Sequence, residues 1–187
     1  MVQTPVRTLT LEEFLQQPDT KPASEYIDGQ IIQKPMPKAD HSVIQADLTT
    51  AINAATKANQ VGRALPELRC TFESRSIVPD IAVLPWAAIP RKEDGKVAGE
   101  LHCAPDWMIE ILSPKQSQTK VVKKIMYALS HGTRMGWLID PDEECVFVYT
   151  PDLRTVLYEA PDAQLPVPEF AIAFQLTVGE LVAWLYE

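Results

Sequence analysis

Two acidic residues lie in segments whose other side chains are mostly apolar. Asp80 lies within IVPDIAVL and Glu110 within WMIEILS, and both segments are typical of buried strands in a central sheet. A buried carboxylate has to be paired, hydrogen-bonded or bound to a metal, because an isolated buried charge costs several kcal/mol. If the strands are neighbours, the two carboxylates can face each other and bind Mg²⁺ or Mn²⁺. The alternative is that each lies at a strand end, solvated or paired with a basic residue.

A group of lysines follows Glu110 along the chain. Lys120, Lys123 and Lys124 lie in residues 118–130, a segment predicted to be a helix that ends before Gly132. Lys120 and Lys124 are four residues apart and share a helix face, with Lys123 beside them. Such a face is most often simply solvated. A cation beside metal-binding carboxylates is also what phosphoryl chemistry uses to orient water and offset developing charge.

The elements that must position these residues can be predicted from periodicity. A short helix is expected at 9–17, followed by two strands from Glu25 to Gln33 about the Asp28-Gly29 turn. Residues 42–58 have apolar residues at helical spacing, and residues 85–105 have the polar, turn-rich composition of an exposed loop. Further strands are expected at 136–140, 144–149 and 154–158, and a final helix at 178–186. This order predicts an α/β fold with a central mixed sheet flanked by helices.

Length and composition set limits on the protein class. The 187 residues correspond to one ordinary domain spanning 1–187. The net charge of -8 argues against a protein that coats nucleic acid by bulk electrostatics, although a local basic patch or bound metal ions can reverse the local sign. Because no apolar run is long enough to span a bilayer, we expect no membrane association and a cytoplasmic location. Three isolated cysteines predict reduced, buried thiols.

Several short blocks, taken together in their order and spacing, resemble a known family. They are Glu25-Tyr26-Ile27-Asp28-Gly29, Pro35-Met36-Pro37, His41, Val78-Pro79-Asp80, Pro105-Asp106, Ile109 to Pro114, and Gly136 to Pro141. With these blocks the chain resembles the bacterial Uma-two family of restriction-endonuclease-like proteins, within the PD-(D/E)xK nuclease superfamily. The resemblance covers nearly the whole chain. It implies a restriction-endonuclease-like core with an N-terminal helix and hairpin extension.

The resemblance also implies roles for individual residues. Asp80 matches the aspartate of the first half-motif and Glu110 the acidic residue of the second. The position of the motif lysine, two residues after Glu110, holds Leu112 instead. The family pattern moves the lysine to the following helix, where Lys124 aligns with it and Lys120 is the substitute. Glu25 and the Ile111 carbonyl are implied as further metal ligands.

The implied activity is metal-dependent hydrolysis of phosphodiester bonds in DNA. Mg²⁺, with Mn²⁺ as a substitute, would activate water at the carboxylates, and Lys124 or Lys120 would assist. His41 and Lys123 are weaker candidates for substrate binding, and a homodimer is expected from the superfamily. Two alternatives stay open: a catalytically weak nuclease-fold module that binds nucleic acid or regulates, and an oligomeric interaction protein without a nucleic-acid role.

Overall fold

The computed structural model describes residues 9–99, 101–114 and 116–187. Its centre is a six-stranded mixed sheet in the order β10-β9-β8-β7-β6-β3. The strands are β3 (Gly62–Pro66), β6 (Ile81–Pro85), β7 (Trp107–Ile111), β8 (Met135–Asp140), β9 (Cys145–Tyr149) and β10 (Thr155–Tyr158). β7 and β8 are parallel and the other neighbours antiparallel. The predicted α/β fold with a central mixed sheet is therefore confirmed.

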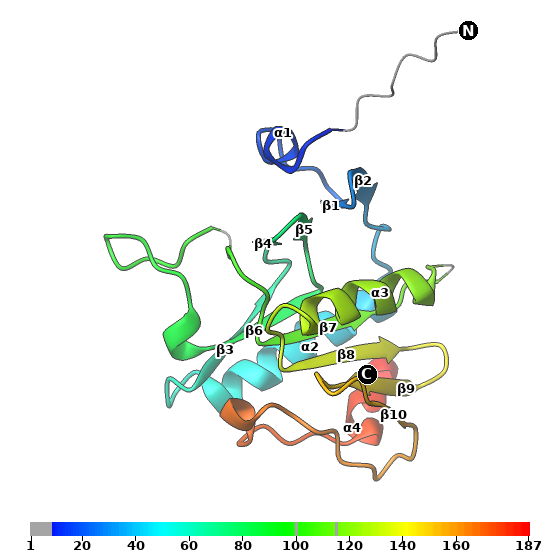
Figure 1. Ribbon diagram of the computed structural model, residues 1–187. Helices are drawn as coiled ribbons and strands as arrows, with labels where there is room; N and C mark the ends of the chain where they lie inside the picture. The colour runs from blue at the N-terminus through cyan, green and yellow to red at the C-terminus, as the bar shows by residue number, and fades with distance from the viewer. Residues whose placement is uncertain (1–8, 100, 115) are drawn as a thin grey trace, which may run out of the picture.

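Helices cover both faces of this sheet (Figure 1). One face packs against α2 (Ala39–Thr56) and α4 (Val178–Ala183), with Ile44, Leu48 and Ile52 of α2 fully buried. The other face packs against α3 (Gln118–Leu129), whose buried apolar side chains meet Met108 and Leu138. None of the helices in the described part of the chain combines the length and apolar character needed to cross a membrane.

A smaller antiparallel sheet, in the order β2-β1-β5-β4, lies beside the main one. It contains β1 (Ser24–Ile27), β2 (Gln30–Gln33), β4 (Cys70–Phe72) and β5 (Arg75–Ile77). The turn between β1 and β2 has positive φ at both Asp28 and Gly29, the conformation that Asp-Gly favours in a two-residue hairpin. With the short helix α1 (Leu11–Leu15), capped by Thr10, this hairpin forms the predicted N-terminal extension at the top of Figure 1.

The strand boundary next to Asp80 differs from the prediction. We read IVPDIAVL as one buried strand, but β5 ends at Ile77 and β6 begins at Ile81. Val78, Pro79 and Asp80 cross from the small sheet to the large one. Pro79 has no N–H to donate to a ladder, so the chain leaves one sheet there and Asp80 stands just before the first residue of β6.

Two smaller expectations also need adjustment. The 85–105 loop contains the 3-10 turn η1 (Trp86–Ala88), and Ile89 and Leu101 are buried, so the loop is not exposed throughout. Cys70 and Cys145 are buried and free as expected, whereas Cys103 is exposed because it lies in the loop that precedes β7. The C-terminal helix is shorter than predicted, because it tightens into the 3-10 turns η3 (Trp184–Tyr186).

Candidate active site

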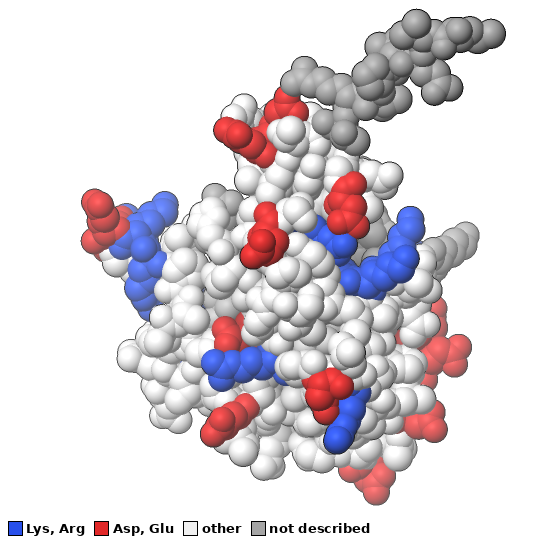
Figure 2. All heavy atoms as spheres, in the orientation of Figure 1, with Lys and Arg blue, Asp and Glu red and all other residues white. Residues whose placement is uncertain are grey.

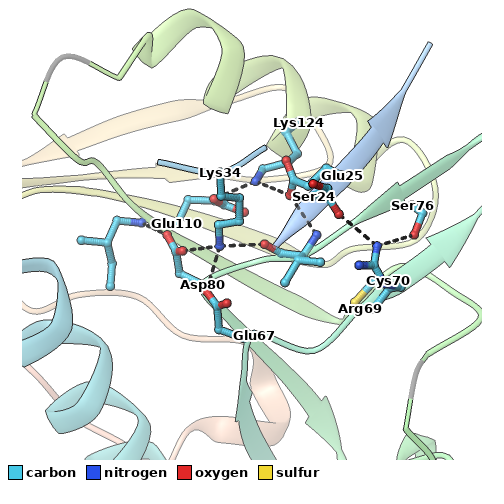
Figure 3. Close-up of polar contacts among 12 residues, drawn as sticks. Ser24, Glu25, Lys34, Glu67, Arg69, Cys70, Ser76, Asp80, Glu110 and Lys124 are labelled. Atoms are coloured by element: carbon cyan, nitrogen blue, oxygen red, sulfur yellow. Dashed lines mark hydrogen bonds and ion pairs between the residues drawn. The ribbon is translucent and has the colours of Figure 1, made fainter. Parts of the chain in front are cut away.

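Four residues singled out from the sequence, Glu25, Asp80, Glu110 and Lys124, come together with a fifth, Lys34, from five separate parts of the chain. Glu25 lies in β1, Glu110 in β7 and Lys124 in α3, while Asp80 immediately precedes β6 and Lys34 immediately follows β2 (Figure 3). β6 and β7 pair with Ile81 opposite Ile109, and one further step of this register sets Asp80 opposite Glu110. This register brings the two carboxylates to adjacent positions across β6 and β7, and the prediction that they bind a metal together stays a prediction.

Lys124 lies between two of the carboxylates. Its Nζ is 2.8 Å from Glu25 Oε1 and 3.0 Å from Glu110 Oε2. Glu25 Oε1 also accepts a hydrogen bond from the backbone N–H of Val78 at 2.8 Å. The three side chains are nearly inaccessible to solvent, with relative exposures of 4% for Glu25, 2% for Glu110 and 5% for Lys124. Lys124 thus connects the hairpin to the central sheet, through a charge-assisted hydrogen bond to Glu25 and an ion pair with Glu110.

Asp80 is held by a second set of donors. Lys34 Nζ is 2.6 Å from Asp80 Oδ1, and the backbone N–H of Ile111 donates to Asp80 Oδ2 at 2.7 Å. His41 Nε2 lies 3.3 Å from the same Oδ2 atom. Gln45, one helical turn after His41, donates from its side chain to the backbone carbonyl of Asp80 at 2.8 Å. The carboxylate is therefore oriented by a lysine, a backbone amide and a histidine.

The pKa values of Asp80 and Glu110 are shifted in opposite directions. Burial alone would raise the pKa of Asp80, but the Lys34 ammonium and His41 outweigh it and lower that pKa below its usual range. Burial raises the pKa of Glu110 well above its usual range, and the attraction of Lys124 only partly offsets this. For Lys124 burial alone would lower the pKa, and the carboxylates of Glu110 and Glu25 raise it, so this ammonium stays charged. The site therefore contains a firmly ionised Asp80 and a Glu110 short of cationic partners.

The site contains more carboxylates than ammonium groups, which explains why Glu110 is short of cationic partners. Three buried carboxylates, Glu25, Asp80 and Glu110, share two ammonium groups, those of the buried Lys124 and of Lys34, whose side chain is 9% exposed. Glu110 Oε1 is buried and has no hydrogen-bond partner among the described residues. The lysines lie against the carboxylate oxygens, and within the described ranges no three His, Cys, Asp or Glu side chains are grouped so as to enclose a metal ion.

The remaining sequence candidates fall inside and outside this cluster. His41 is buried in it, and Ile111 joins it through its N–H; the carbonyl role predicted for Ile111 stays a prediction. Lys120 and Lys123 are exposed on α3 and do not reach it. Of the two lysines proposed as alternatives, the structure therefore places Lys124 beside the carboxylates.

Sequence reasoning missed Lys34. Besides Asp80, its Nζ contacts the Val78 carbonyl at 2.9 Å and Glu67 Oε1 at 3.1 Å. A lone lysine after a short strand is usually solvated, so its type gave no signal. The one feature of the sequence that could have pointed to Lys34 is its position directly before Pro35-Met36-Pro37, a block that carries the family resemblance.

Comparison with known proteins agrees with this geometry. Residues 11–179 match the Uma2 family, described as "Putative restriction endonuclease". The chain belongs to the Uma2 family. It is thus related to restriction-endonuclease-like nucleases, as the sequence blocks had indicated.

A solved structure is similar over almost the whole chain. It is described as a "putative nuclease belonging to DUF820" from Anabaena variabilis, with 56% sequence identity and a TM-score of 0.92. The match covers 94% of this chain and 98% of that one. No curated protein matches. The Uma2 fold and its nuclease relationship are therefore established for this chain, and its chemistry has to be argued from the site.

Proposed function

We propose that this Uma2 protein is a metal-dependent nuclease that hydrolyses phosphodiester bonds of DNA at the Asp80–Glu110 pair. The observation that carries the proposal is the position of these two buried carboxylates, with Asp80 directly before β6 in register with Glu110 on the neighbouring β7, and with the Lys124 ammonium against Glu110. Carboxylates brought together in a protein interior repel each other unless a cation is shared between them. Membership of the Uma2 family indicates nuclease chemistry, and a pair of carboxylates is suited to that reaction.

The oxygen chemistry of the donors, rather than their present grouping around the lysines, suits a hard divalent cation. Carboxylate oxygens are the ligands that Mg²⁺ and Mn²⁺ prefer, and the unpartnered Oε1 of Glu110 is an oxygen with coordination capacity to spare. Asp80 and Glu110 would hold the ion, with Glu25 and the Ile111 carbonyl as the further ligands that the family resemblance implies. When bound, Mg²⁺ supplies Lewis-acid activation of water and offsets charge on the phosphate.

The protein's own groups have separate tasks in this proposal. The Ile111 N–H fixes the orientation of Asp80, and the Glu25 carboxylate fixes Lys124. Lys124, kept charged by its two carboxylates, stabilises negative charge that develops on the phosphate. Lys34 stays beside Asp80 as a second cation of the same site.

The experiment is a cleavage assay with purified protein on supercoiled plasmid, linear duplex, single-stranded DNA and RNA, in Mg²⁺, Mn²⁺ or EDTA. We expect cleavage that depends on the metal and is lost in Asp80→Asn and Glu110→Gln, while Asp162→Asn, a change at an exposed carboxylate, retains it. Calorimetric titration with Mn²⁺ provides a second measurement. Absence of cleavage of every substrate, together with Mn²⁺ binding unchanged in Asp80→Asn, would refute the proposal.

One observation favours a second candidate, a nuclease-fold module that binds nucleic acid without cutting it. Asp80 and Glu25 are already neutralised by Lys34 and Lys124, so these carboxylates have partners without any metal. Retarded migration of DNA in a gel, with no product in either metal, would support this second function over the first.

A further inference from the structure

A cavity of about 820 Å³ opens onto the site. Its lining includes Lys34, His41, Gln45 and Asp80, of which His41 and Asp80 are buried. It also includes residues between 14 and 24, from the end of α1 to the start of β1, together with Ile31 and residues 35–37. A substrate that enters this cavity therefore arrives beside the Lys34 and Asp80 pair.

The size of the cavity limits what can enter. It lies within the range of roughly 300–1,000 Å³ found for pockets that enclose small ligands. A DNA duplex cannot be enclosed in such a space, since its major groove alone is about 12 Å wide. A few unpaired nucleotides can be enclosed in it. Enzymes whose target atoms are buried inside a duplex likewise act on single-stranded or extruded nucleotides. Because Asp80 and Glu110 are each 2% exposed, the reacting bond has to come to them.

The charge of the lining also limits the length of the bound segment. The chain has a net charge of -8, and on the face drawn in Figure 2 acidic and basic side chains are interspersed. In the cavity, Lys21, Lys34 and Arg69 balance Asp19, Glu67 and Asp80. A few cations in a locally neutral lining suit one or two phosphates, whereas duplex tracking needs an extended basic surface.

The rim of the cavity offers apolar contacts for bases. Three large apolar side chains in the lining are well exposed, Leu15 at 41%, Ile31 at 43% and Met36 at 69%. Met36 is flanked by Pro35 and Pro37, which also line the cavity. Unpaired bases expose flat apolar faces that pack on such side chains without regard to sequence. In a duplex those faces are stacked on one another and cannot make this contact.

We propose that this cavity binds a short single-stranded segment of nucleic acid, with its bases against the Met36 rim and a phosphate directed toward Lys34 and Asp80. The proposal rests on the nuclease function proposed above and specifies its substrate as unpaired nucleotides. Within that function, Lys34 is a phosphate-positioning residue for the strand as it enters.

Binding is tested separately from cleavage. Fluorescence anisotropy measures the Kd of a labelled single-stranded 12-mer and of the blunt duplex of the same sequence, in buffer with Ca²⁺, which takes oxygen ligands as Mg²⁺ does. We expect the single strand to bind at least about tenfold more tightly than the duplex. Equal affinity, or tighter binding of the duplex, would overturn the proposal.

A matched pair of variants locates the binding surface. Met36→Glu places a negative charge on the rim and should weaken single-strand binding about tenfold. Ile172→Glu makes the same change of charge at a side chain that is 73% exposed and outside the cavity, and should leave the Kd unchanged. Both positions are exposed, so both variants should fold. Unchanged single-strand affinity in Met36→Glu overturns the proposal, whereas selective binding without cleavage supports it and counts against the nuclease reaction.

Discussion

The two faces of the six-stranded sheet are equally buried and yet serve different purposes, and β7 shows the difference within one strand. Trp107, Ile109 and Ile111 point into the core formed with α2 and α4, while Met108 and Glu110 belong to the face under α3. The relative exposure is 0–2% for all five residues. We call the side of the sheet under α2 and α4 the structural face and the side under α3, which contains Glu110, the chemical face. Burial by itself therefore does not distinguish the two.

Partners distinguish the two faces. Trp107 packs edge-on against Trp137 with ring centroids 4.8 Å apart, and the indole N–H of Trp137 donates to the Pro166 carbonyl at 3.0 Å, while the indole N–H of Trp107 has no hydrogen-bond partner among the described residues. Glu110 is satisfied only in part, by Lys124 on one oxygen, with the other unpartnered among the described residues. The α2 face is held by apolar and aromatic packing, whereas the α3 face contains an ionisable carboxylate with one unpartnered oxygen that a ligand can satisfy.

The largest effect is expected on the structural face. Trp107→Ala removes a fully buried indole and leaves a cavity, so the free energy of unfolding should fall by about 3–5 kcal/mol. Chemical denaturation monitored by circular dichroism measures this change. A loss below about 1 kcal/mol would mean that the α2 face is not the main source of stability.

A smaller loss is expected when the cation of the chemical face is removed. Lys124→Met keeps the length of the side chain but leaves Glu25 and Glu110 without their shared ammonium. Removing one partner of a buried pair costs about 3–5 kcal/mol, and we expect the lower end because Glu110, whose pKa is already raised, can take up a proton. Lys120→Met, on the same helix but exposed, should show no measurable change in the same denaturation experiment.

The packing of α3 against the sheet can be altered without touching a charged group. A Cβ atom added at Gly136 would lie 2.3 Å from Ile125 Cγ2, so Gly136→Ala requires the Ile125 side chain, or the helix that carries it, to move away from β8. Overpacking of this kind costs about 1–3 kcal/mol. If the helix sets the position of Lys124, this variant should also reduce cleavage per folded molecule. Unaltered activity in a destabilised variant would contradict that link.

The smallest effect on stability is expected at Glu110. Glu110→Gln removes a charge that burial disfavours, so the free energy of unfolding should change by no more than about 1 kcal/mol, while cleavage is lost. Chemical denaturation of Glu110→Gln and of Lys124→Met, measured in the same way, gives the two free energies of unfolding to be compared. A cost equal to that of Lys124→Met would make Glu110 a structural ion-pair partner and blur the distinction between the faces.

Much of this architecture was predictable from local sequence. The Asp28-Gly29 turn requires positive φ at both residues, and the helical spacing around Ile44 and Leu48 follows from burial of one face. The family resemblance supplied Glu25, which composition and spacing could not. Asp80 and Glu110 were identifiable because a charge within an apolar run needs a partner.

Long-range features were not predictable in the same way. The β-branched run around Asp80 has the pattern of one strand. It forms two strands because its first part pairs in the small sheet and its second part in the large one. Lys120 and Lys124 share a helix face by spacing, so the choice between them depends on which turn of α3 lies beside the carboxylates, and this is set by the packing of the helix against the sheet. Lys34 reaches Asp80 across 46 positions of the chain, a contact that no local pattern records.

In the usual half-motif the acidic residue and the lysine lie on one strand, so the pleat of the backbone fixes the spacing between them. By the resemblance, Leu112 occupies the lysine position here and belongs to the apolar cluster under α3, while the proposed ammonium, that of Lys124, comes from the helix. The acidic residue and the lysine are therefore carried by two separate elements that are joined by a packing interface. Changes of side chains at the α3–β8 contact can alter the distance between them while every proposed site residue stays the same.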